Sequence, residues 1–341
     1  MDKRAISIRD VAQAAGVSTA TVSRALNAPG RVSEETRRAV LEAVKATGYS
    51  VNPAGRNLRQ RRTGSVVALV PNIANPFFSA ILAGISSVLR PAGLNLLIAD
   101  TLAGENREGP VRDYLDRTRS DGVILFDGNV SPTALEPRAG VETPPLVMAC
   151  EWLEGCPLPH VGIDNAAGAR VVTEHLLSLG HRDVAHVMGP PENVLTQTRA
   201  EGYRTALAEA GLPCRDDWIL PGDFSLASGA RAAEMWLALP DRPRAVFCSN
   251  DEMACGFISA LAAKGVSVPR DVSVAGFDDI ELAQHVHPPL TTLHQPRRAL
   301  GIDAAKLLLD LIAAPELYGA THRIEPVELV RRGSTAAPCD G

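Results

Sequence analysis

The sequence predicts an α/β protein in which a small all-helical N-terminal domain precedes a large core of two lobes built on doubly wound parallel sheets. Residues 7–48 carry helical periodicity with capping residues, whereas from Ser65 apolar runs of strand length alternate with segments of helical length. Such alternation is typical of parallel sheets covered by helices. About 270 residues follow Ser65. Because this is too many for one open sheet, we expect two lobes with a cleft between them.

The net charge is unevenly distributed along the chain. Residues 1–63 hold 12 basic and 5 acidic residues, and the remaining residues hold 22 basic and 34 acidic ones. A net charge of −5 for the whole chain therefore hides a basic N-terminal segment. This is the sign expected for contact with a phosphate backbone.

The first two helices are predicted from their caps and their apolar spacing. Ser7 can cap a helix that begins at Ile8, and Asp10 completes a capping-box pair. Gly16 permits a sharp turn, and Ser18 can cap the second helix. The apolar residues expected to face inward from these helices and the turn are Ile8, Val11, Ala12, Ala15, Val17, Val22 and Leu26.

A third helix is predicted to begin after a cap at Ser33 and to end at Gly48. We expect it to bury Val40, Leu41 and Val44. Three short helices around one small core indicate a helix-turn-helix domain. The alternative is a plain helical hairpin used for packing.

The outward face of the second helix carries small hydroxyl groups and one arginine, as a helix that enters the major groove of DNA would. We expect Arg24 to contact guanine, Thr19 and Ala20 to reach base edges, and Thr21 and Ser23 to hold phosphates. The full set predicted to contact DNA from this helix is Ser18, Thr19, Ala20, Thr21, Ser23, Arg24 and Asn27.

Residues 50–63 are predicted to form a short helix only when DNA supplies contacts. About two turns of helix are not stable alone in water, and the segment carries several arginines. Leu58 is placed to wedge between base steps from the minor groove. The residues predicted to contact DNA here are Asn52, Arg56, Leu58 and Arg59. The alternative is a flexible linker whose Leu58 packs on a neighbouring domain.

The N-terminal motifs resemble those of the lactose/galactose repressor (LacI/GalR) family of bacterial transcriptional regulators. The motifs are Ile8-Arg-Asp-Val-Ala, Gly16-Val-Ser-Thr-Ala-Thr-Val-Ser-Arg-Ala-Leu-Asn, Arg31-Val-Ser-Glu-Glu-Thr-Arg and Gly48-Tyr49. The resemblance implies a hinge helix over residues 52–58 with Leu58 as the intercalating leucine. Gly55 departs from the family's usual alanine, which lowers the intrinsic stability of that helix.

The resemblance also implies a core like that of periplasmic sugar-binding proteins, whose chain crosses between lobes three times. We expect the crossings near residues 163–165, 289–292 and 324–326. The predicted domains are a helix-turn-helix domain (1–49), a hinge (50–63), a core (64–333) and a tail (334–341). The first lobe would comprise about 64–163 with 293–324, and the second 164–290 with 325–333. Strands are predicted at residues 66–70, 94–99, 123–126, 146–148, 184–188, 245–248 and 272–275.

The sequence carries no catalytic signature, so we expect neither catalytic residues nor a cofactor nor a metal. There is no Walker-type loop, no Gly-x-Gly-x-x-Gly and no Gly-x-Ser-x-Gly, and the six cysteines have no zinc-finger spacing. No export signal is evident, and no stretch approaches the ~18–20 apolar residues of a membrane span. The prediction is a cytoplasmic protein, associated with the nucleoid through operator binding, with no membrane partner.

The predicted ligand-binding residues are Phe77, Phe78, Asp100, Arg199, Phe224, Asn250, Asp251 and Asp278. The phenylalanines after the first predicted strand offer aromatic faces to a ring, and Asp100 ends the second strand. The resemblance implies the roles of Arg199, Phe224 and the later residues. The alternatives are a structural ion pair for Arg199 with Asp278, and core packing for Phe77 and Phe78.

Several segments are similar to the cytidine repressor branch of the family: residues 145–152, 222–224, 245–251 and 332–335. Asn193 stands where the purine-binding branch uses arginine, which argues against a free purine. We therefore expect a homodimeric regulator, most often a repressor in such families, that binds a near-palindromic operator and responds to a nucleoside, with a sugar next. No leucine heptad follows Arg332, so a dimer is the expected assembly. The alternatives are a solute-binding receptor without a DNA role and a nucleoside- or sugar-processing enzyme.

Overall fold

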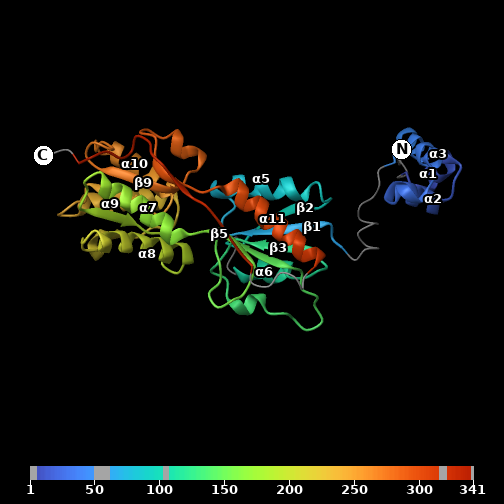
Figure 1. Cartoon of the computed structure of the whole chain (residues 1–341), viewed down its shortest axis with the longest axis horizontal. Helices are drawn as coiled ribbons and strands as arrows, with labels where there is room; N and C mark the ends of the chain where they lie inside the picture. Colours follow the sequence, from blue (N-terminus) through green and yellow to red (C-terminus); the bar gives the residue numbers. More distant parts are fainter. Residues whose placement is uncertain (1–5, 50–61, 103–106, 315–320, 339–341) are drawn as a thin grey trace. The chain divides into compact units, whose positions relative to one another are not determined.

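The computed structural model describes residues 6–49, 62–102, 107–314 and 321–338. The chain divides into two compact units, residues 1–60 and residues 61–341 (Figure 1). The predicted hinge residues Asn52, Arg56, Leu58 and Arg59 lie outside the described residues.

The N-terminal unit contains three α-helices whose ends follow the predicted signals. They are α1 (Ile8–Ala15), α2 (Thr19–Asn27) and α3 (Glu34–Thr47), with a 3-10 helix η1 (Pro29–Arg31) between the last two. Ser7 and Asp10 form the predicted capping box, and the Ser18 hydroxyl accepts from the backbone N–H of Thr21. Gly16 and Gly48 end α1 and α3 at φ values of 65° and 68°, where a side chain would be strained.

The small core of this unit corrects one prediction. It is formed by Val11, Ala12, Val22, Ala25, Val40 and Ala43. Leu41, which we predicted to be buried, is 46% exposed. At about 100° per residue, Val40 and Ala43 share one face of α3, and Leu41 is turned away from it. Ala43, which was not predicted to be buried, faces the core together with Val40.

The larger unit contains two six-stranded sheets, one in each lobe. The first sheet is wholly parallel, in the order β11 (His322–Glu325), β5 (His160–Ile163), β4 (Leu146–Ala149), β3 (Gly122–Leu125), β1 (Ser65–Val70) and β2 (Asn95–Asp100). The second has the order β12 (Glu328–Val330), β10 (Thr291–His294), β9 (Ser273–Asp278), β8 (Ala245–Cys248), β6 (Val184–Val187) and β7 (Ile219–Leu220). Only β12 runs antiparallel to its neighbour in the second sheet.

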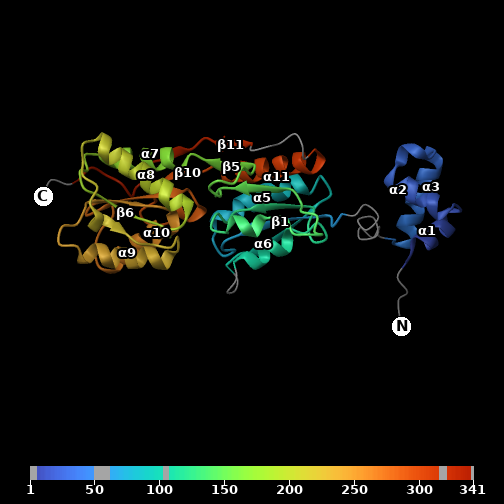
Figure 2. The same cartoon turned by 90° about the horizontal axis from the view of Figure 1, so that it is seen from below.

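Helices cover both faces of each sheet, as Figure 2 shows for the first lobe. The helices of the first lobe are α5 (Phe77–Leu89), α6 (Glu108–Tyr114) and α11 (Arg297–Ala313), with a 3-10 helix η2 (Pro132–Leu135). The helices of the second lobe are α7 (Asn165–Ser178), α8 (Val194–Glu209), α9 (Leu226–Ala238) and α10 (Asp251–Ala263), with 3-10 helices η3 (Asp216–Trp218) and η4 (Glu281–Gln284). No helix in the described part of the chain is long and apolar enough to cross a membrane.

Strand alternation explains these layers. In β1, Val66, Ala68 and Val70 belong to the core beneath α5 and α11. The intervening Val67 and Leu69 pack with Val111 of α6 on the other face. Side chains of successive strand residues point to opposite faces, so a continuous apolar run is what a strand covered on both sides requires.

The chain crosses between the lobes after β5, after β10 and after β11. The second crossing differs from the prediction, which placed it at residues 289–292 and assigned residues from 293 to the first lobe. Thr291–His294 form β10, which pairs with β9 of the second sheet, so the chain leaves the second lobe only at Gln295. The five strands β5, β7, β10, β11 and β12 were not predicted, and each has four residues or fewer.

Candidate ligand-binding and DNA-binding sites

A cavity of about 860 Å³, including its open mouth, lies between the two lobes of the core. Its walls are the segments that follow β1, β2, β3 and β4 in the first lobe and β6, β7 and β8 in the second, together with the end of β9. Ligands of open parallel sheets bind at these carboxyl ends of strands. Six of the eight predicted ligand residues line the cavity: Phe77, Phe78, Arg199, Phe224, Asn250 and Asp278.

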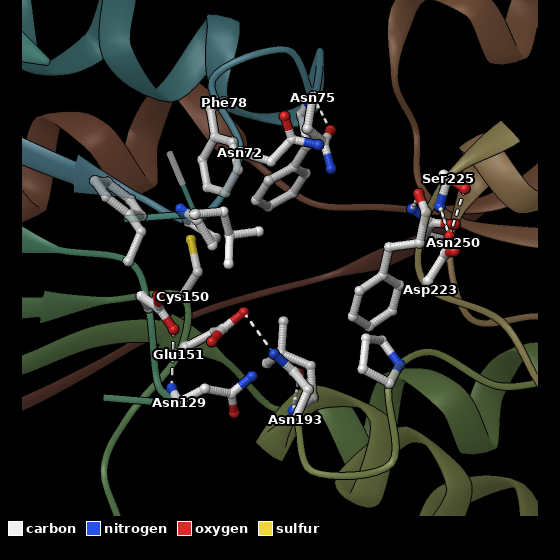
Figure 3. Close-up of a pocket in the computed structure, with 18 of the residues that line it drawn as sticks. Asn72, Asn75, Phe78, Asn129, Cys150, Glu151, Asn193, Asp223, Ser225 and Asn250 are labelled. Atoms are coloured by element: carbon white, nitrogen blue, oxygen red, sulfur yellow. Dashed lines mark hydrogen bonds between the residues drawn. The ribbon is translucent and has the colours of Figure 1, made fainter. Parts of the chain in front are cut away.

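The first lobe supplies an aromatic wall. Phe77 and Phe78 are 8% and 7% exposed, and their ring centroids lie 5.3 Å apart in an edge-to-face arrangement. Phe78 makes a second edge-to-face contact with Phe126, at 5.6 Å. The two predicted phenylalanines therefore belong both to the core and to the cavity wall. Figure 3 shows Phe78 with Asn72 and Asn75 on this side of the cavity.

The second lobe holds Phe224 on the cavity wall by a specific backbone arrangement. Phe224 has a φ of 66°, and the side-chain amide of Asn250 donates to its carbonyl oxygen at 3.0 Å. A Cβ at Gly189 would overlap the Phe224 ring and the Thr196 hydroxyl. Glycine at position 189 therefore makes room for the ring. Asn250 also accepts from the backbone N–H of Met253 and so caps α10. The nitrogen of its side-chain amide thus holds the Phe224 backbone, and the oxygen holds the start of the helix.

Arg199 and Asp278 are buried together, at 3% and 5% exposed, with 3.7 Å between the nearest nitrogen and oxygen. The guanidinium donates to Asn165 Oδ1 at 2.9 Å and to the Ser249 carbonyl at 2.6 Å, and lies 3.9 Å from the centroid of the Phe277 ring. A guanidinium has five N–H donors, so donors remain for a ligand. Arg199 and Asp278 are an ion pair and also line the cavity.

Burial controls the protonation of this pair. It raises the pKa of Asp278 to about 6, against the opposing effect of Arg199 and Arg297 and the hydrogen bond from Gln295. Burial also lowers the pKa of Arg199, while the surrounding carboxylates support its charge. Gln295 Nε2 donates to Asp278 Oδ1 at 2.7 Å. The same oxygen, Oδ1, is the one nearest to the Arg199 guanidinium.

The two remaining predicted ligand residues do not line the cavity. Asp100 accepts from the backbone N–H groups of Ile73 and Leu102, and so joins the loops after β1 and β2. Asp251 is fully buried and accepts from the Thr292 hydroxyl and the Ile280 N–H. Both carboxylates hold loops beside the cavity without lining it, and their predicted role as ligand-binding residues stays a prediction.

Two cavity residues, Glu151 and Asn193, are not among the predicted ligand-binding residues. Glu151 lies in the first lobe and Asn193 caps α8 in the second, and both line the cavity. Asn193 Nδ2 donates to Glu151 Oε1 at 2.9 Å, the dashed line between these residues in Figure 3. The backbone N–H of Gly128 donates to Glu151 Oε2 at 2.7 Å. The available signal was that Glu151 closely follows the predicted strand 146–148.

Burial raises the pKa of Glu151 to about 7, opposed by the hydrogen bonds from Asn193 and Gly128. Nearby Asp127 raises it further and Arg199 lowers it. Asp127 is itself buried beside the Thr101 hydroxyl and is ion-paired with Arg107 at 3.4 Å. No group of three or more His, Cys, Asp or Glu residues suited to a metal ion occurs among the described residues.

The predicted DNA-reading face lies on α2 and at its N-cap. Thr19, Ala20 and Arg24 are exposed, and Thr21 and Ser23 are partly buried. The Ser18 hydroxyl lies 2.8 Å from that of Thr21 and caps the helix, so it shapes the N-terminal turn. The Asn27 side chain is outside what the structure describes.

The comparisons with known proteins cover both units. Residues 7–52 match the model of bacterial regulatory proteins of the lacI family, and residues 173–335 match a periplasmic binding protein-like domain. The chain is 38% identical to the HTH-type transcriptional repressor CytR of Escherichia coli (strain K12), over 98% of this chain and 97% of that protein. It is 35% identical to the HTH-type transcriptional repressor PurR of Photobacterium profundum, over 96% of this chain and 98% of that protein.

Two solved structures resemble the chain over nearly its whole length. The lac repressor dimer bound to operator and the anti-inducer ONPF has a TM-score of 0.85 and 28% identity, covering 98% of this chain and 100% of that chain. The transcriptional regulator CelR–cellobiose complex has a TM-score of 0.71 and 33% identity, covering 96% and 99%. The predicted fold class and the prediction of a regulator rather than an enzyme are confirmed. The chain belongs to the lacI family of bacterial regulatory proteins, transcriptional regulators that combine a helix-turn-helix DNA-binding domain with a ligand-binding domain.

Proposed function

We propose that this protein is a homodimeric repressor that binds a near-palindromic operator on the bacterial nucleoid and is controlled by a nucleoside bound between its lobes. The observation that carries the proposal is the lining of the cavity. Both lobes contribute aromatic side chains and buried, hydrogen-bonded polar groups to it. An apolar cavity with a few fixed polar groups is typical of a small-molecule site.

The chemistry of the cavity walls favours a ligand with a flat ring and hydroxyl groups. Phe78 and Phe224 offer aromatic surfaces from opposite lobes. Arg199 supplies donors and Asp278 an acceptor, the combination that a hydroxyl group satisfies. A nucleoside presents both parts in one neutral molecule. A sugar is the second candidate, because Arg199 and Asp278 suit it as well, and a relative has been solved as a complex with cellobiose.

Two contacts that bridge the lobes support control by such a ligand. Asn193 of the second lobe donates to Glu151 of the first. Arg297 of α11 donates to the carbonyl oxygens of Phe77 in the first lobe and Asp279 in the second, at 3.4 and 2.9 Å. A ligand that touches both lobes shifts their arrangement only by the difference in its affinity for the two arrangements.

The edge strand β2 supports the proposed dimer. Among the described strands it has a neighbour on one side only, and its Leu97 and Ile98 are each 42% exposed. Exposed apolar side chains on an unpaired sheet edge favour association with another chain. A two-fold dimer would present two copies of α2 to the half-sites of a palindromic operator.

The test is an electrophoretic mobility shift assay with the full chain and the DNA upstream of its own gene. We expect a specific complex whose stability changes when a nucleoside is added and is unaffected by the free base. A response to a sugar but to no nucleoside would replace the proposed effector by the second candidate. Binding of all duplexes with equal affinity would refute the operator proposal, and a monomer at the working concentration would refute the dimer.

A further inference from the structure

Asp121 is a buried carboxylate that does not line the ligand cavity and holds residues close to the start of the core unit. It is 4% exposed and directly precedes β3. Its Oδ1 accepts from the backbone N–H of Thr63 and its Oδ2 from that of Gly64, each at 2.8 Å. Hydrogen bonds to an ionised carboxylate are about twice as strong as those between neutral groups. One side chain therefore uses both of its oxygens to hold two successive peptide groups.

The strand on the other side of β1 holds the same part of the chain. The backbone N–H of Asn95, the first residue of β2, donates to the Gly64 carbonyl oxygen at 2.9 Å, and its side-chain amide donates to the same oxygen at 3.3 Å. Gly64 has a φ of 73°, a conformation that favours glycine. Residues 63 and 64 are thus tied to both neighbours of β1 before β1 begins.

These residues lie at the covalent connection between the two units of the chain. The units divide between residues 60 and 61, so the chain runs from the helix-turn-helix domain through residues 50–61 into Arg62 and Thr63. Each protomer has one such connection. A change in the position of the first lobe therefore reaches the DNA-binding domain through this connection only if residues 63 and 64 move with the lobe.

The length of chain that Asp121 fixes decides whether a small movement is transmitted. An extended residue spans about 3.3–3.6 Å, so releasing residues 63 and 64 would add about 7 Å of free chain. Shifts of structural elements in allosteric transitions are about 1–5 Å. The freed chain would absorb a shift of this size, whereas hydrogen-bonded residues carry it.

We propose that Asp121 is a positioning residue for operator binding, which fixes the point where the chain leaves the first lobe for the DNA-binding domain. The inference rests on the proposed dimeric repressor and needs no particular effector. Two linked domains bind one operator more tightly than one domain does, because the second binding event is intramolecular and depends on the length and stiffness of the link. Loosening the link at Asp121 should reduce this gain about tenfold and should leave the affinity of a single domain unchanged.

The experiment compares, by mobility shift, the affinity of the full chain for its complete operator and for a duplex with a single half-site. In Asp121→Asn the amide oxygen can accept from one N–H, while the amide nitrogen is a donor and cannot accept from the other. The ratio of operator affinity to half-site affinity should fall about tenfold, with half-site affinity unchanged.

Asp116→Asn is the matched control. Asp116 lies in the same loop before β3, and its carboxylate holds Thr118 within that loop by accepting from the backbone N–H at 2.8 Å and from the hydroxyl at 2.7 Å. This variant should keep the wild-type ratio, because it loses a loop contact of the same kind and leaves the hydrogen bonds of Asp121 in place.

Two further measurements hold even if Asp121→Asn does not fold. Inserting Gly-Ser before Thr63 leaves Asp121 and its hydrogen bonds in place and adds about 7 Å of chain, so it should lower the ratio by the same factor. In the wild type, hydrogen exchange followed by mass spectrometry should show the amides of Thr63 and Gly64 exchanging about as slowly as those of β1.

The outcomes separate this inference from the proposed function. A wild-type ratio in Asp121→Asn or in the insertion variant would overturn the inference, as would rapid exchange at residues 63 and 64 in the wild type. Equal losses on the operator and on the half-site would mean that Asp121 only stabilises the fold. If the wild type itself binds the operator no more tightly than the half-site, the proposed binding of a dimer to the operator is wrong and this inference fails with it.

Discussion

Replacing Arg199 by methionine should destabilise the core unit and abolish ligand binding, and the loss of stability should depend on pH. The guanidinium forms two hydrogen bonds, at 2.9 and 2.6 Å, and lies 3.7 Å from Asp278. Breaking a buried pair by removing one partner costs about 3–5 kcal/mol, because the other charge is left uncompensated. We therefore expect the free energy of unfolding at pH 8 to fall by about that amount.

The pH dependence follows from the sign of the Asp278 shift. Its pKa is raised to about 6 by burial even with Arg199 present. A carboxyl that binds its proton more tightly in the folded chain than in the unfolded chain loses stability as pH rises through the folded pKa. Without Arg199 this pKa rises further, and each further unit costs about 1.4 kcal/mol at pH 8. The loss in Arg199→Met should therefore be smaller at pH 5 than at pH 8.

Urea unfolding followed by tryptophan fluorescence measures this loss, since all three tryptophans, at positions 152, 218 and 236, lie in the core unit. The slope of the unfolding free energy against urea concentration should stay constant, while the urea concentration at the midpoint of unfolding should fall. The double variant Arg199→Met with Asp278→Asn should recover the pH-dependent part of the loss but should not recover ligand binding. An equal loss at pH 5 and pH 8, with no recovery in the double variant, would refute the electrostatic account of the pair.

Three further predictions follow from individual side chains. Arg24→Ala should weaken operator binding by about 1–3 kcal/mol and flatten the preference at one base position, which a binding-site selection would show; an unchanged preference would remove Arg24 from the base-reading set. Gly189→Ala should displace the Phe224 ring and weaken effector binding about tenfold or more by isothermal titration, whereas an unchanged affinity would mean that Phe224 does not contact the ligand. Leu97→Glu should weaken the dimer in sedimentation experiments because it places a charge on the exposed β2 edge; a fully dimeric variant would exclude this edge from the interface.

Local signals in the sequence predicted much of the secondary structure. Ser7, Gly16, Ser18 and Gly48 mark helix ends through caps and left-handed turns, which depend on residues within one turn of the chain. The long apolar runs of the core strands are equally local. Local signals did not predict the exposure of Leu41. Val40 and Leu41 are adjacent apolar residues, and only Val40 packs in the core formed with the neighbouring helices.

Local sequence signals did not predict features that depend on tertiary contacts. β10 has four residues and a polar sequence, Thr-Thr-Leu-His, and it is a strand because β9 and β12 supply its hydrogen bonds. Asp251 and Asp278 both lie at the carboxyl ends of core strands, so their position did not separate them. Asp251 is turned towards Thr292 and Ile280, whereas Asp278 faces the cavity.

Backbone strain indicates which part of the ligand site is rigid. Cys150, Phe224 and Asp278 line the cavity with φ values of 66°, 66° and 112°. A residue held in such a conformation costs about 1–3 kcal/mol, and it persists only where neighbours fix it. Val161 and Asn250 hold Cys150 and Phe224 by hydrogen bonds within their own lobes, and Gln295, at the crossing after β10, holds Asp278.

Because each lobe holds its own part of the cavity, the separation of the lobes is the variable that a ligand can change. The contacts that differ between a closed and an open arrangement are those that bridge the lobes, such as Asn193 with Glu151 and Arg297 with the Asp279 carbonyl. Coupling between sites in proteins is about 1–3 kcal/mol, which is the scale of one or two such hydrogen bonds. Asn193→Ala should therefore change the effector concentration needed for half-maximal response in the mobility shift assay by about tenfold. Its effect on operator affinity without effector should be smaller than tenfold. Equal changes in both quantities would mean that Asn193 contributes to the stability of the core and not to the coupling between effector and operator binding.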